Sequence, residues 1–156
     1  MTTIAYDGRY VAADSRTMAG DVLLSGRTEK LRVHGGYLFA LCGAGAAFGP
    51  WVDWFMEKQA CKNPTLPNLD KDRHGSTNFM VFKYDLGWQM FSLGVPYSEW
   101  RNEPHAWGSG DMYAITAMDC GKLAHEAVIL AAKRDPYTDD RVMVYDLLER
   151  CFVEPG

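Results

Sequence analysis

Residues 2–14 read TTIAYDGRYVAAD, and this stretch decides how the rest of the chain is interpreted. Residues 2–6 and 10–14 are rich in β-branched and aromatic side chains, and the Asp7-Gly8 pair between them is a tight-turn signal. The segment predicts a β-hairpin, and the prediction places Thr2 already within its first strand.

Further strands and three helices are expected downstream. Extended segments are predicted at 22–24, 31–33, 37–42, 78–85, 88–93 and 141–148. Apolar residues at three- and four-residue intervals predict a helix over 46–62, and a helical pair is expected at 111–120 and 123–133. The polar stretch before Gly20, the proline-rich residues 63–77 and the connection that ends at Gly108 are predicted to be irregular. This order favours an α+β fold of antiparallel sheets covered by helices.

Length and composition are those of one soluble domain spanning residues 1–156. Hydrophobic residues make up 47% and charged residues 23% of the chain, a balance typical of globular proteins. The formal net charge is -4, and lysine and arginine are scattered along the sequence. Because nucleic-acid binding requires a basic surface, no nucleic-acid partner is expected.

The cysteines and histidines suggest neither a disulfide framework nor a metal site. Cys42, Cys61, Cys120 and Cys151 are far apart, which favours isolated buried thiols and a cytoplasmic location. The four histidines show no paired ligand spacing, and residues 44–47 lack the spacing of a phosphate-binding loop, so no metal or cofactor is expected. A secretion signal or a membrane span is not predicted either.

Several short motifs follow one another in a recognisable order. They are Thr2-Thr3-Ile4, Val11-Ala12-Ala13-Asp14, Lys30, Ala44-Gly45-Ala46-Ala47, Gly108-Ser109-Gly110 and Arg134-Asp135-Pro136-Tyr137-Thr138. With these motifs, residues 2–144 resemble the proteasome β-subunit family, which includes the proteolytic subunit of the bacterial two-component ATP-dependent protease. The resemblance implies an N-terminal-nucleophile hydrolase fold, a four-layer αββα sandwich of two antiparallel sheets. One helix stands where family members usually carry two, so a reduced helical layer is expected.

The resemblance also implies a chemistry. A threonine hydroxyl is a poor nucleophile near neutral pH, and an N-terminal threonine can use its own α-amine, with a pKa of about 8, as the base. Thr2 would be that nucleophile once Met1 is removed, with Lys30 lowering the hydroxyl pKa and Asp14 fixing Lys30. The Gly45 N–H would form the oxyanion hole. The supporting residues that orient the amine and the catalytic water would be Ser109, Asp135 and Thr138.

Each of these residues also has a structural interpretation when taken alone. Thr2 could simply start a strand, Asp14 could end one, and Lys30 could be a surface charge; Ser109 could cap a helix. Taken together they favour a threonine peptidase that acts on peptides or unfolded proteins, self-associates and has an unfolding ATPase as a candidate partner. An N-terminal-nucleophile amidase for a small acyl amide and a non-catalytic assembly or binding subunit remain as alternatives.

Overall fold

Two antiparallel sheets form the centre of the chain, which a computed structural model describes over residues 2–19, 22–23, 29–43, 45–58, 77–92 and 98–155. The first sheet has the order β11 (Cys151–Val153), β10 (Val142–Asp146), β2 (Tyr10–Asp14), β1 (Thr3–Tyr6) and β9 (His105–Gly108). The second has the order β5 (Leu31–His34), β6 (Tyr37–Cys42), β7 (Asn78–Lys83) and β8 (Gly87–Phe91). A separate small ribbon pairs β3 (Met18–Ala19) with β4 (Val22–Leu23).

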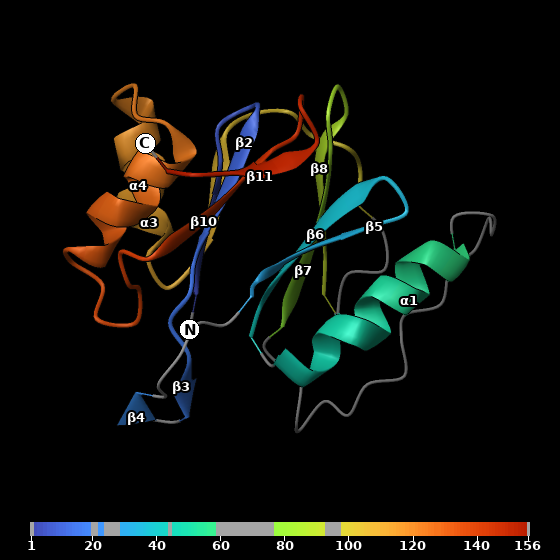
Figure 1. Cartoon of the computed structure of the whole chain (residues 1–156), viewed down its shortest axis with the longest axis horizontal. Coiled ribbons are helices and arrows are strands. Elements are labelled where there is room, and N and C mark those ends of the chain that lie inside the picture. The colour runs from blue at the N-terminus through green and yellow to red at the C-terminus, as the bar shows by residue number, and fades with distance from the viewer. Residues whose placement is uncertain are drawn as a thin grey trace.

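Helices cover the outer face of each sheet (Figure 1). On the first sheet lie α3 (Asp111–Asp119) and α4 (Ala124–Ala132). A short 3-10 turn, η1 (Gly45–Ala47), leads into α1 (Phe48–Lys58) on the second sheet. The layers therefore run helix, sheet, sheet, helix. The predicted four-layer sandwich is confirmed, and within the described residues one helix, α1, covers the second sheet, in agreement with the expected reduced helical layer.

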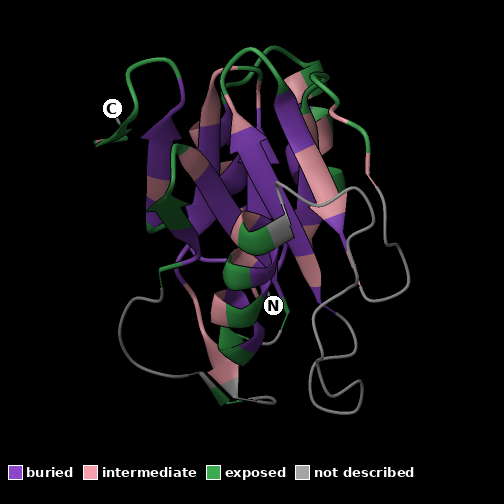
Figure 2. Cartoon of the chain, turned by 90° about the vertical axis from the view of Figure 1, so that its right-hand side faces the viewer, coloured by how far each residue is buried: buried purple, intermediate pink, exposed green. Residues whose placement is uncertain are grey.

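Strand alternation divides the buried residues among three hydrophobic clusters. Along β1, Ile4 and Tyr6 point into the space between the two sheets, whereas Ala5 faces α3 and α4. This is the period of two that a strand buried on both faces requires. Figure 2 shows the result, with buried residues along both sheets and an exposed outer face on α1.

The two helical layers are packed with different side chains. Small residues fill the layer under α3 and α4, among them Ala5, Ala12, Ala106, Ala114, Ala117, Ala124, Ala127 and Ala131. Rings fill the layer under α1, among them Phe39, Phe48, Trp51, Trp54, Phe55, Phe79 and Phe91. Trp51 stacks on Phe79 with ring centroids 5.3 Å apart and is fully buried. Small side chains let α3 and α4 approach the first sheet closely, next to the Thr2 end of β1.

Several predicted boundaries were wrong. The connection before Gly108 contains β9, the polar stretch before Gly20 contains β3, and β11 follows the last predicted strand. These strands have only two to four residues, too few to show a period, and pairing with distant partners creates them. Strand β1 begins one residue after Thr2. The predicted helix over 46–62 begins as a 3-10 turn and is described to residue 58; residues 59–76, with most of the predicted loop, lie outside the described residues.

The prediction of buried thiols was correct for one of the three described cysteines. Burial raises the pKa of Cys42 to about 12, whereas Cys120 and Cys151 are exposed. Cys61 lies outside the described residues. In the part of the chain that the structure describes, no helix has the length and apolar character that crossing a membrane requires.

Candidate active site

Thr2 lies immediately before β1 and is 7% exposed. Its carbonyl accepts a hydrogen bond from the Ser109 N–H at 3.0 Å, next to the point where Thr3 pairs with Gly108 of β9. A Cβ on Gly108 would lie 1.6 Å from the Thr2 carbonyl oxygen, and the φ of Gly108 is +101°. Only glycine fits this position, because both the space and the backbone conformation exclude a side chain.

A buried ion pair joins Lys30 to Asp14. The Lys30 Nζ lies 2.8 Å from Asp14 Oδ1, and the two side chains are 7% and 0% exposed. The Asp14 carboxylate also accepts backbone N–H bonds from Thr3 at 3.0 Å, Arg16 at 3.3 Å and Asp139 at 3.2 Å. These donors provide hydrogen-bond partners for the oxygens of a fully buried carboxylate.

Three of the residues proposed from sequence, Thr2, Lys30 and Gly45, open onto one cavity of about 240 Å³. The other residues that line it are Arg16, Thr17, Met18, Glu29, Leu41, Gly43 and Phe48. Gly45 begins η1, and nothing lies within 4 Å of the position that a Cβ would occupy there. The cavity therefore has room for a ligand group next to the Gly45 backbone.

Ser109, Asp135 and Thr138 form a second cluster. The hydroxyls of Ser109 and Thr138 each donate to Asp135 Oδ2 at 2.5 Å, and the Tyr137 N–H donates to Asp135 Oδ1 at 3.1 Å. Burial favours the protonated acid, but these hydrogen bonds outweigh it and lower the pKa of Asp135 below its ordinary value. Asp135 is therefore an ionised acceptor near neutral pH.

The sequence analysis assigned no role to Thr3 or Asp139. The Thr3 backbone N–H binds Asp14, as does that of Asp139. The Asp139 carboxylate in turn accepts from Ser15 N–H at 3.2 Å and from Arg141 at 2.8 Å. Direct adjacency to Thr2 was the signal that could have identified Thr3, since the residue after a terminal nucleophile fixes its carbonyl.

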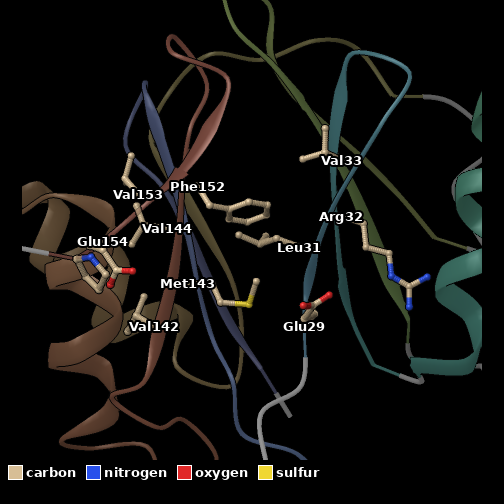
Figure 3. A pocket seen from close by; sticks show the side chains of 11 residues that line it. Glu29, Leu31, Arg32, Val33, Val142, Met143, Val144, Phe152, Val153 and Glu154 are labelled. Atoms are coloured by element: carbon tan, nitrogen blue, oxygen red, sulfur yellow. The ribbon is translucent and has the colours of Figure 1, made fainter.

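A larger groove of about 630 Å³ lies between β5 and the β10–β11 pair, and Glu29 lines both it and the Thr2 cavity. Figure 3 shows Leu31 on one side and Met143 and Phe152 on the other, with their side chains directed into the groove. None of the seven residues proposed from sequence lines it. Among the described residues, no three histidine, cysteine, aspartate or glutamate side chains are grouped to hold a metal ion.

Comparison with known proteins gives both sequence and structural relatives. No family model matches the sequence. Proteasome subunit beta type-5 of Gallus gallus is 27% identical over 177 residues, which covers 92% of this chain and 69% of that protein.

Two solved proteins have the same fold. Eukaryotic HslV from Trypanosoma brucei superposes with a TM-score of 0.69 at 16% identity, covering 92% of this chain and 97% of that one. BPH from Thiobacillus denitrificans gives a TM-score of 0.61 at 18% identity, covering 94% and 97%, and 0.59 in its complex with epoxomicin. The chain is thus similar in sequence to proteasome subunit beta type-5 and shares the fold of HslV.

Proposed function

We propose that the chain is a threonine peptidase whose nucleophile is Thr2, made N-terminal by removal of Met1. The observation that carries the proposal is the buried Lys30–Asp14 ion pair, whose lysine lines the same cavity as Thr2 and Gly45. A buried lysine needs a functional or structural reason, because desolvation of its charge is costly. Here its charge would lower the pKa of the Thr2 hydroxyl.

Acylation follows from these groups. The Thr2 Oγ1 attacks the carbonyl carbon of the scissile peptide bond, and its proton passes to the free α-amine of Thr2. The resulting oxyanion accepts a hydrogen bond from the Gly45 N–H, a type of contact worth about 3 kcal/mol of barrier. When the C–N bond breaks, the α-ammonium returns its proton to the departing amine. The acyl group remains as an ester on Thr2.

Hydrolysis of that ester uses the same groups in reverse. The α-amine takes a proton from a water molecule as the water oxygen attacks the ester carbonyl. The Thr2 oxygen then departs and recovers a proton from the α-ammonium, which releases the carboxylic acid and restores the enzyme. The ionised Asp135 with Ser109 and Thr138 would orient the amine and this water, which is the role proposed for the second cluster.

The cavity suggests which substrates fit. Leu41 and Phe48 are buried apolar side chains of its lining, and Met18 adds a third apolar residue. A side chain of a peptide or unfolded protein, bound on the acyl side of the scissile bond, would contact them. The proposal includes one domain over residues 1–156, self-association, an unfolding ATPase as candidate partner and a cytoplasmic location. Light scattering of the purified protein tests the self-association.

The first experiment incubates the purified protein with a peptide epoxyketone and records its intact mass. This reagent needs the threonine hydroxyl and the free α-amine together, so an adduct mapped to Thr2 supports the proposal. The comparison with BPH, whose structure includes epoxomicin, makes this the natural first probe. If Met1 is absent, the protein is folded and several peptide sequences give no adduct, the peptidase proposal fails.

A matched variant completes the test. Thr2→Ala removes the nucleophile and is expected to abolish both the adduct and the hydrolysis of fluorogenic peptides. A Thr2→Ala protein that cleaves them at the unaltered rate contradicts the mechanism. Hydrolysis of small acyl amides in the absence of peptide cleavage would support the amidase alternative instead.

A further inference from the structure

The side chain of Thr3 is fully buried. The residue contacts both groups described above, the Lys30–Asp14 pair and the Ser109–Asp135–Thr138 cluster. Its Oγ1 accepts a hydrogen bond from the Gly110 N–H at 3.1 Å and lies 2.6 Å from the Thr138 Oγ1. Thr138 in turn donates to Asp135. Thr3 is therefore in contact with the Asp135 cluster through its side chain and with Asp14 through its backbone N–H.

The hydrogen bonds that link Gly110, Thr3, Thr138 and Asp135 have defined directions. An ionised carboxylate only accepts, so the single hydroxyl hydrogen of Thr138 is used on Asp135. Thr138 must then accept at its contact with Thr3, and Thr3 must donate its own hydrogen. The Thr3 oxygen keeps its lone pairs for the Gly110 N–H. The bonds run from Gly110 through Thr3 and Thr138 to Asp135, with one orientation for each hydroxyl.

The surroundings of Gly110 are tightly packed. A Cβ on Gly110 would lie 2.3 Å from Thr3 Oγ1, 3.1 Å from the Ala131 Cβ and 3.2 Å from Thr138 Oγ1. The backbone of Gly110 can approach Thr3 because position 110 carries no side chain and the neighbouring helix α4 presents an alanine. A side chain at position 110 would therefore displace the Thr3 hydroxyl from its contacts with the Gly110 N–H and Thr138.

We infer that Thr3 is a positioning residue for the Thr2 nucleophile, coupling the Lys30–Asp14 pair to the Ser109–Asp135–Thr138 cluster through one peptide unit. This inference rests on the proposed function. One peptide bond joins Thr3 to Thr2, so anchoring both the N–H and the side chain of Thr3 fixes where the Thr2 carbonyl and Cα lie. The Ser109 N–H holds that carbonyl from the other side. Misplacing a reacting group by about 1 Å costs roughly 100-fold in rate.

The test replaces Thr3 by valine, which keeps the shape and removes the hydroxyl. We expect kcat for a cleaved peptide to fall about 10- to 100-fold while KM stays within a factor of about three, since substrate contacts are unaltered. Thr3→Ser restores the hydroxyl and is expected to recover most of the lost kcat. Thr116→Val is the matched control, because the Thr116 hydroxyl binds the Met112 carbonyl on the exposed face of α3.

The outcomes separate the two proposals. If the unaltered protein neither cleaves peptides nor forms the Thr2 adduct, the proposed function fails and this inference fails with it. If the unaltered protein is active and the folded Thr3→Val variant has the same kcat, the positioning role alone is overturned. A KM increase of the same size as the kcat loss would also overturn it, because that pattern indicates lost substrate binding.

If the Thr3→Val variant does not fold, a second measurement on the unaltered protein tests the same contact. Hydrogen exchange of the Gly110 amide in the unaltered protein reports on the bond to Thr3 directly. Strong protection is expected, because donor and acceptor are both buried. Exchange at the rate of a solvent-exposed amide overturns the inference.

Discussion

Lys30 and Asp14 form a 2.8 Å ion pair across 16 residues of sequence, and the aspartate of that pair is fully buried. The same carboxylate holds backbone N–H groups of Thr3, Arg16 and Asp139. A single side chain thus connects the candidate nucleophile's neighbour, the lysine and the turn after α4.

The Asp14→Asn substitution tests this arrangement. Asparagine keeps the shape but removes the charge and turns one oxygen into a donor that faces N–H groups. We expect the free energy of unfolding to fall by about 3–5 kcal/mol, since removing one partner leaves a buried lysine charge without its carboxylate. Urea denaturation measures it. Asp53→Asn, on the exposed face of α1, is the control and should change stability by less than about 0.5 kcal/mol; an equally small change for Asp14→Asn would contradict the prediction.

Gly108→Ala is expected to destabilise the protein by about 3 kcal/mol or more, because strain and a steric clash act together. The added Cβ would meet the Thr2 carbonyl at 1.6 Å in a backbone with φ of +101°. Gly121→Ala isolates the strain, since Gly121 has φ of +88° with nothing within 4 Å of its Cβ position. That control should cost about 1–2 kcal/mol. Equal losses of stability in the two variants would show that the contact with Thr2 is relieved at no cost.

The low pKa of Asp135 gives a pH dependence. A carboxyl whose folded pKa lies below its unfolded value of about 3.9 stabilises the fold above that pH. This stabilisation is lost as the pH falls through the folded pKa. Ser109→Ala removes one of the hydrogen bonds that hold the pKa of Asp135 down against the effect of burial. We therefore expect a loss of about 1.5–3 kcal/mol at pH 7 that shrinks below about pH 4.

Urea denaturation of both proteins at pH 7 and at pH 3 measures that difference. The pKa values of Asp139 and Asp146 are lowered too, but both groups are present in the variant and their contributions cancel. A stability difference between the two proteins that is the same at both pH values would mean that Ser109 does not stabilise the charged form of Asp135.

Substrate preference should follow the lining of the Thr2 cavity. Apolar Leu41 and Phe48 line it together with the exposed Glu29. We expect higher kcat/KM for peptides with an apolar residue before the scissile bond than for peptides with an acidic one, because Glu29 repels a second negative charge. Glu29→Gln should improve cleavage of the acidic peptide by up to about fivefold, the equivalent of about 1 kcal/mol for an exposed charge pair. Glu57→Gln, on the exposed surface of α1, is the control; a matching gain there would exclude a role for Glu29.

Sequence reasoning reached the fold because its signals were local. Turn residues and hydrophobic periods of two and 3.6 residues predict the hairpins and helices directly from the sequence. Strand β9 could not be found in this way, since four residues from His105 to Gly108 become a strand by pairing with β1. Its absence from the prediction hid the contact that holds the Thr2 carbonyl.

The candidate site was predictable in part for a different reason. Thr2, Asp14, Lys30 and Gly45 came from motifs in a known order, and the structure places three of them on one cavity and Asp14 beside Lys30. The hydroxyl contact between Thr3 and Thr138 spans 135 positions of sequence. No periodicity or spacing rule connects two such threonines, so only the folded chain shows the contact.

The donors around Asp14 also bear on when the proposed chemistry of Thr2 could begin. They come from the start of β1, the segment after β2, Lys30 just before β5, and the turn after α4, so the ion pair is complete only when distant parts of the polypeptide have met. Contacts of such long sequence separation carry a loop-closure entropy cost, which the chain must offset before they stabilise it. An unfinished chain would therefore carry a threonine with ordinary, weak nucleophilicity. Under the proposed function, the ion pair that would activate Thr2 is therefore absent until these segments have come together.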